Sequence, residues 1–209
     1  MMKTHARWAA AALLLAMGLG GCAKEVVVGG QKHVDTRATG DGTPEGGASG
    51  SRAAAYDLAP ALAVAGRAEG TITFDAKVSL VTSTGSVVPL NSSLATAVVR
   101  IDGSDTVTVI SGDVPAARYT AVRVAFTRVQ ANVTSGLVIG GTSVTGLINV
   151  SITRGDSIVV ERAVDLGAPE ADVRLLIDLD ASAWLSAANP ATRLVAAAIF
   201  RDAVKVRTF

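Results

Sequence analysis

The stretch TITFDAKVSL, residues 71–80, decides the fold. Apolar residues stand at every even position of this stretch and polar residues at every odd position. Because successive side chains of a β-strand point to opposite faces, a period of two predicts a strand with one buried face and one face in water.

Comparable runs rich in Val, Ile and Thr follow along the chain, separated by Gly- and Asp-containing turns. They lie at residues 94–101, 106–110, 118–133, 137–139, 144–153, 157–166, 173–179, 193–200 and 203–209. Parallel strands need long crossover connections, usually helices, and no long helical segment lies between these runs. Residues 181–188 lack alternation and predict one short helical turn before Asn189-Pro190. The pattern predicts an all-β fold, an antiparallel Greek-key β-sandwich of about eight strands.

The start of the chain carries a targeting signal. Lys3 and Arg7 precede an apolar run of about a dozen residues, which is short of the roughly 20 that a membrane-spanning helix needs. The run ends in Leu19-Gly20-Gly21-Cys22, which resembles the lipobox of bacterial lipoproteins. The resemblance implies that residues 1–21 are a signal peptide and that Cys22 is lipidated. Ala23, where Asp would retain a lipoprotein at the inner membrane, implies anchoring in the outer membrane of a two-membrane host.

Residues between the signal and the first clear strand are different in kind. Residues 40–51 combine Gly, Ser, Pro and Asp without an apolar period. We therefore expect residues 22–66 to be the lipidated cysteine followed by a flexible tether, and residues 67–209 to be the β-sandwich domain.

Composition narrows the range of partners. Removal of residues 1–21 takes away Lys3 and Arg7, which changes the net charge from +1 to about −1. Without a basic excess, nucleic acid is not an expected partner. The expected partners are the membrane, through the lipid on Cys22, and an envelope protein or glycan. No cofactor is expected.

Two short motifs resemble a second family. The segments DVPAARYTAVRV, residues 113–124, and LIDLDA, residues 176–181, resemble segments of a family of bacterial lipoprotein domains of unknown function. That family has a transthyretin-like Greek-key sandwich, so the resemblance implies a sandwich and no particular activity. The chain departs from the family at Ala117, where Gly is usual, and lacks its opening Thr-Asp-Ala-Pro turn.

Catalytic groups are scarce in the expected domain. His5 belongs to the signal and His33 to the expected tether, which excludes Ser-His-Asp and Cys-His catalysis and typical zinc sites from the domain. Asp178 and Asp180 lie two residues apart on one predicted strand, roughly 6–7 Å from each other. That separation is compatible with a hydrolase, although the solvent-facing end of a strand explains the pair more simply.

Other groups indicate binding. Asp102 and Asp105 flank a tight turn and offer oxygen ligands of the kind calcium takes. If Asp102, Asp105, Asp178, Asp180 and Trp184 converge in space, they form a carbohydrate- or calcium-dependent site.

The expectation that covers these observations is a membrane-anchored lipoprotein, a non-enzymatic binding or envelope structural module. Its contacts would come from loops at one end of the sandwich or from an exposed sheet edge. A carbohydrate- or calcium-dependent binding domain is the alternative, and a hydrolase built on paired aspartates is a third possibility.

Overall fold

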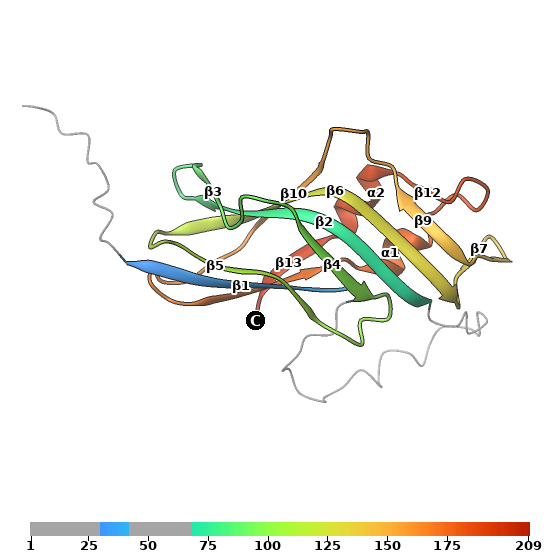
Figure 1. The fold of residues 1–209 in the computed structure, drawn as a ribbon, viewed down its shortest axis with the longest axis horizontal. Helices are drawn as coiled ribbons and strands as arrows, with labels where there is room; N and C mark the ends of the chain where they lie inside the picture. The colour runs from blue at the N-terminus through green and yellow to red at the C-terminus, as the bar shows by residue number, and fades with distance from the viewer. Residues whose placement is uncertain (1–29, 42–67) are drawn as a thin grey trace, which may run out of the picture.

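The computed structural model describes residues 30–41 and 68–209, which form an all-β, sandwich-like fold with two short helices (Figure 1). The first sheet has four strands in the order β13 (Lys205–Thr208), β11 (Val173–Asp178), β1 (Gln31–Thr39) and β5 (Val107–Pro115). The second has seven strands, β12 (Leu194–Val195), β9 (Gly146–Val150), β6 (Tyr119–Ser135), β2 (Glu69–Thr82) and β3 (Val87–Pro89), with β10 (Ile158–Ala163) on β6 and β4 (Ala95–Arg100) on β2. A small hairpin joins β7 (Val138–Ile139) to β8 (Thr142–Ser143).

The alternating stretch at residues 71–80 lies in β2, at the centre of the seven-stranded sheet. Its even-numbered side chains from Ile72 to Leu80 are fully buried, as the period of two predicts. β2 pairs antiparallel with β6 along nearly its whole length. The predicted all-β sandwich is therefore confirmed, while its Greek-key connection stays a prediction.

The predicted domain boundary needs a correction at β1. Gln31–Thr39 was expected to be tether, yet it is a central strand of the four-stranded sheet, between β5 and β11. Its side chains alternate, with Lys32, Val34, Thr36 and Ala38 buried in the core. The inward positions include a lysine and a threonine, so the hydrophobic period is weak. The other expected tether residues, 23–29 and 42–66, lie outside the described residues, as does the expected signal peptide.

Two further details differ from the expected architecture. The strands are mostly antiparallel, but β1 pairs with β11 in parallel and β12 pairs with β9 in parallel. Residues 193–200 were expected to form one strand, whereas only Leu194–Val195 is strand and α2 (Ala197–Ala203) follows it. Three successive alanines favour a helix at that point. The helical turn expected at 181–188 is present as α1 (Ala181–Leu185).

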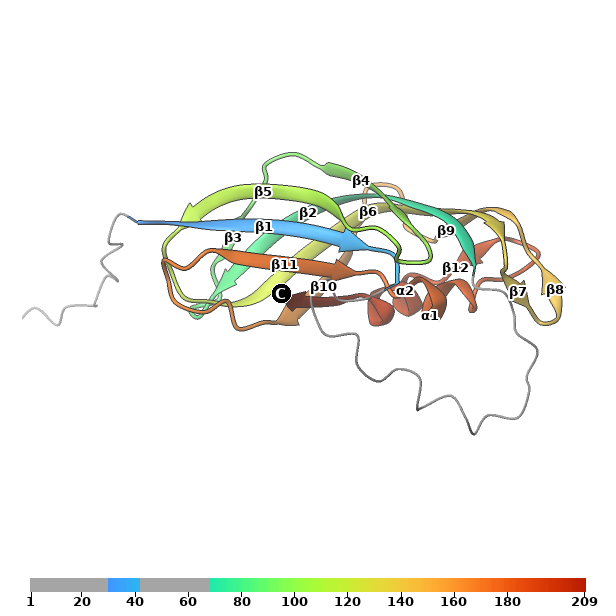
Figure 2. The same cartoon turned by 90° about the horizontal axis from the view of Figure 1, so that it is seen from below.

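The two helices lie beyond the end of the four-stranded sheet and cover the rest of the seven-stranded sheet (Figure 2). A row of aromatic rings joins them to the sheet: Trp184 of α1 packs edge-on against Phe200 of α2, with ring centroids 5.5 Å apart. Phe200 packs against Phe126 of β6 at 5.1 Å, and Phe126 against Phe74 of β2 at 5.7 Å. Such edge-to-face pairs add roughly 0.5–1.5 kcal/mol each beyond the burial of their area.

A buried lysine fastens the loop before β11. Lys32 points inward from β1, and its Nζ donates hydrogen bonds of 2.6 Å to the carbonyl oxygens of Leu166 and Ala168. Burial lowers the pKa of Lys32, and Asp165 and Asp172 nearby oppose that change. The ammonium group thus gives the buried Leu166 carbonyl a hydrogen-bond donor, and it adds a donor to the Ala168 carbonyl, which also accepts the Ala171 N–H.

We predict that Lys32→Met lowers the free energy of unfolding by about 1–3 kcal/mol, because it leaves the buried Leu166 carbonyl oxygen without its lysine donor. Urea denaturation measures the change. Gln31→Met, at the exposed neighbouring position, is the matched control and should stay within about 0.5 kcal/mol. Equal stability of the two variants would contradict the assigned role of Lys32.

Candidate functional site

The outward face of the four-stranded sheet carries a histidine with two polar partners on the neighbouring strand. His33 Nδ1 lies 2.7 Å from Asp113 Oδ1, and His33 Nε2 lies 3.0 Å from Ser111 Oγ. The Ala116 N–H donates to the Gly30 carbonyl at the end of this ladder. Gly30 and Ala116 are therefore a hydrogen-bonded pair of the β1–β5 ladder, and hydrogen-bonded and non-hydrogen-bonded pairs alternate along it. His33 and Asp113, three positions further on, form a non-hydrogen-bonded pair, in which facing side chains approach most closely.

A second polar row runs beside the first. Asp35 of β1 is flanked in register by Ser111 of β5 and Arg174 of β11. Asp172 immediately precedes β11 and, by the same register, lies next to His33. Charges of both signs therefore alternate across three strands on one face.

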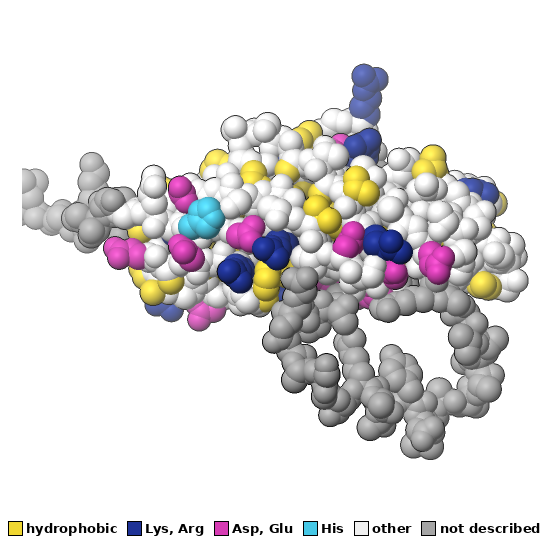
Figure 3. Space-filling view, turned by 60° about the horizontal axis from the view of Figure 1, so that its bottom comes forward, with side chains coloured by type: hydrophobic (Ala, Val, Ile, Leu, Met, Phe, Trp, Pro, Cys, Tyr) yellow, Lys and Arg dark blue, Asp and Glu magenta, His cyan; other side chains and the backbone are white. Residues whose placement is uncertain are grey.

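These residues surround a pocket of about 410 Å³, and its lining consists of His33, Asp35, Thr108, Ser111, Asp172, Val173 and Arg174. The space-filling view shows a histidine among acidic side chains on this face, with basic side chains close by (Figure 3). Six of the seven lining residues are polar, and they come from β1, from β5 and from β11 with the residue before it. The pocket can thus both donate hydrogen bonds to a ligand and accept them from it.

The acidic neighbours alter the titration of His33. The hydrogen bond to Asp113 raises the pKa of His33; partial desolvation opposes the rise, and the negative charges of Asp113, Asp172 and Asp35 add to it. Since Nδ1 faces a carboxylate, the proton of the neutral ring belongs on Nδ1, which leaves Nε2 to accept the Ser111 hydroxyl proton. About half of the His33 side chain is exposed, so solvent screens the ion pair.

This arrangement corrects the exclusion of a Ser-His-Asp group from the domain. The premise was that His33 lies in a tether, but β1 places it on the sheet. The side chains of residues 31–39 alternate between exposed and buried positions. In the sequence this appears as a weak period of two, with Val34, Thr36 and Ala38 between more polar residues, and that period is the signal that could have predicted the strand. His33 and Asp113 are 80 residues apart, so no local sequence pattern predicts that they are hydrogen-bonded.

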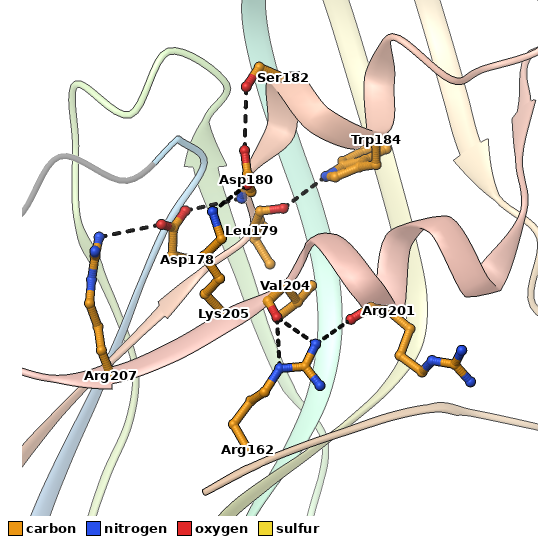
Figure 4. Close-up of polar contacts among 10 residues, drawn as sticks. All are labelled: Arg162, Asp178, Leu179, Asp180, Ser182, Trp184, Arg201, Val204, Lys205 and Arg207. Carbon is orange, nitrogen blue, oxygen red and sulfur yellow. Dashed lines mark hydrogen bonds and ion pairs between the residues drawn. The ribbon is translucent and has the colours of Figure 1, made fainter. Parts of the chain in front are cut away.

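The structure places the predicted pair Asp178 and Asp180 together but gives each a basic partner (Figure 4). Asp178 is nearly buried, accepts the Asp180 N–H at 3.0 Å and lies 3.3 Å from Arg207. Asp180 adopts a left-handed backbone conformation (φ 46°), so it is no longer part of the strand, and its carboxylate lies 2.6 Å from Lys205 Nζ. The pair joins β11, β13 and α1, and this structural use does not favour a hydrolytic role.

Trp184 lies close to these aspartates but faces the core. Its ring is fully buried, and its Nε1–H donates to the Leu179 carbonyl at 3.1 Å (Figure 4). A buried ring offers no stacking surface to a sugar. The structure thus gives no support to its expected role as a ligand contact.

Asp102 and Asp105 serve their own turn. Asp102 Oδ1 accepts hydrogen bonds from the backbone N–H and the hydroxyl of Ser104. These bonds and the nearby Arg100 lower the pKa of Asp102, and slight desolvation opposes the change. Asp105 Oδ1 accepts the Arg100 N–H at 2.8 Å. A calcium ion would therefore have to compete with these hydrogen bonds for the carboxylate oxygens of Asp102 and Asp105.

The two aspartate groups lie on either side of the end of β1. The Ala181 N–H donates to the Gly40 carbonyl at 2.8 Å, and a Cβ added at Gly103 would overlap the Asp41 carbonyl oxygen. Within residues 30–41 and 68–209, however, no three His, Cys, Asp or Glu side chains come together in a way that would hold a metal ion. The calcium hypothesis gains no support from this part of the chain.

Comparison with known proteins adds no identification: no family model, curated protein or solved structure matches the chain. The resemblance of residues 113–124 and 176–181 to a lipoprotein domain family thus stays a prediction. Cys22 lies outside the described residues. In the described ranges, neither helix has the length and apolar character needed to cross a bilayer.

We predict that the pKa of His33, followed by NMR titration of its ring, lies above the ordinary value of about 6.5 and falls in Asp113→Asn. Because the folded pKa is raised, the contact stabilises the fold fully below the unfolded value, and this stabilisation is lost as pH rises through the folded value. Asp156→Asn, in a distant turn, is the control and should leave the titration unchanged. A titration that is insensitive to Asp113→Asn would refute the assigned pairing.

Proposed function

We propose that this chain is a lipid-anchored envelope protein whose domain binds a glycan on the outward face of the four-stranded sheet. The observation that carries the proposal is the polar pocket of about 410 Å³ around His33. Its carboxylates, hydroxyls and guanidinium group complement sugar hydroxyls, which both donate and accept hydrogen bonds.

The sheet edges favour this face over pairing with a partner strand. The edge strand β13 has four residues and carries Lys205 and Arg207, and β3 contains Pro89. Leu90 lies against β5 at Gly112. On β10, Arg162 donates to the carbonyls of Arg201 and Val204 (Figure 4), so the α2 end lies against that strand. Short, charged or covered edges oppose strand addition.

Arg174 and Asp172 give the pocket its polarity. Neither side chain forms an ion pair with another residue in the described ranges 30–41 and 68–209, although both line the pocket. A ligand that hydrogen-bonds to both therefore displaces water rather than a protein partner. This makes Arg174 and Asp172 the best positions at which to test binding.

The position of β1 supports a site close to the membrane. Gln31 follows Cys22 by nine residues, so an extended chain permits at most about 30 Å between them. If Cys22 carries lipid, the His33 pocket is within reach of the outermost sugars of a lipid-linked glycan. An outer-membrane location remains part of this proposal, on the evidence of Ala23.

We expect a thermal-shift screen of the full chain against envelope glycans to find a ligand that stabilises it, by about 2.7 kcal/mol at a hundred times its dissociation constant. Arg174→Ala should abolish the shift, whereas Arg154→Ala, in an exposed turn, should retain it. Parallel samples with calcium and with chelator test the calcium alternative. Absence of a shift with every glycan, or an equal shift in both variants, would reject the proposed site.

We also predict that cells expressing the chain incorporate labelled palmitate into it and retain it in the membrane fraction, because acyl chains contribute about 0.8 kcal/mol per buried CH₂. Cys22→Ala should abolish both the label and the membrane retention. Ser83→Ala is a control outside the signal and should change neither. Label persisting in Cys22→Ala would overturn the lipoprotein assignment.

A further inference from the structure

We propose that Ser111, His33 and Asp113 form a nucleophilic site that removes acyl groups from an O-acylated glycan held in the same pocket. This inference rests on the glycan binding proposed above and adds a reaction to it. The inference is carried by one juxtaposition. The Ser111 hydroxyl lies 3.0 Å from the His33 imidazole, which lies 2.7 Å from the Asp113 carboxylate. Ser111 and His33 line the pocket, and Asp113 lies behind His33.

The three groups have the order that activation of a serine requires. Asp113 holds the proton-bearing Nδ1 of His33 and stabilises the imidazolium form. His33 Nε2 faces Ser111 Oγ and can take its proton as the oxygen attacks. The sheet keeps these positions, because Ser111 and Asp113 are alternate residues of β5 and β1 places His33 opposite Asp113.

The reaction balances with water as the co-reactant. Ser111 Oγ attacks the ester carbonyl carbon while its proton passes to His33 Nε2, and the bond from that carbon to the sugar oxygen breaks. The imidazolium returns the proton to the departing sugar hydroxyl, which leaves an acyl-Ser111. Water then loses a proton to Nε2, attacks the acyl carbon and releases a carboxylic acid, and Ser111 recovers its proton. The net change is ester plus water to alcohol plus acid.

Arg174 is the group that would stabilise the negative carbonyl oxygen. It lies in register with Ser111 across the single strand β1, and the two backbones are about 10 Å apart at the usual strand spacing. An arginine side chain extends over most of that distance, and its guanidinium donates several hydrogen bonds to an oxyanion. Arg174 also lines the pocket, so it faces the same ligand.

The charges around His33 determine when the site works. Asp113 on β5, Asp35 on β1 and Asp172 before β11 all favour the protonated ring, and together they outweigh its partial desolvation. Arg174 is the nearby lining cation. Only the neutral ring accepts the Ser111 proton, so the reaction should accelerate as pH rises through the raised pKa of His33 and level off above it.

The first test is reaction of the full chain with a fluorophosphonate, followed by mass spectrometry of the labelled peptide. We expect one phosphonyl group on Ser111, none there in Ser111→Ala, and labelling at least tenfold slower in His33→Gln. Ser143→Ala, an exposed strand serine outside the pocket, should label as the parent does. Labelling spread over other serines, or unaffected by His33→Gln, would overturn the proposal even if every variant folds.

The second test separates this inference from glycan binding. Release of acetate from an O-acetylated glycan and hydrolysis of p-nitrophenyl acetate are compared in the parent chain and Ser111→Ala, alongside the thermal shift with the unacetylated glycan. Loss of hydrolysis with retention of the shift supports both proposals. A shift without hydrolysis by the parent chain rejects the nucleophilic site alone, and Ser111-dependent p-nitrophenyl acetate hydrolysis without any shift rejects glycan binding alone.

Discussion

The pairing of β1 with β5 on one side and β11 on the other holds the four-stranded sheet together. No other strand lies between β5 and β11 in that sheet, so without β1 the two would have no partner in common. The same pairing brings His33 to Ser111 and Asp113, and it places Lys32 beneath the loop before β11. Core, loop and pocket all depend on this one strand. Its partners lie about 80 and 140 residues away along the chain, and contacts of such separation are slow to form.

The sequence predicts those strands in which the buried side chains are apolar and the exposed side chains are polar. β2 alternates cleanly, and its one buried face follows from that pattern. β1 has the same geometry, but Lys32 and Thr36 occupy inward positions, so a search for apolar periodicity passes over it. An inward lysine is tolerated because two carbonyl oxygens receive its hydrogen bonds, and no local pattern announces such a partner.

The candidate site was harder to predict for a related reason. Aspartates two residues apart do share a face of a strand, but the left-handed conformation of Asp180 ends the strand between them. Asp178 and Asp180 then serve Arg207 and Lys205 of the last strand, which lies 25 or more residues further along the chain. Ser111 and Asp113 are also two residues apart, and there the strand continues. Their importance depends on a histidine from a distant strand, which only the assembled sheet reveals.

The central position of β1 has a mechanical consequence for a protein held at a membrane. If the lipid on Cys22 resists a load applied to the rest of the domain, the force enters the fold through Gln31 and acts along the axis of β1. The hydrogen bonds to β5 and β11 run across that axis, so they share the load in shear and do not open one after another from an end. Anchoring through Cys22 would thus make the attachment point one of the parts of the molecule most resistant to extraction.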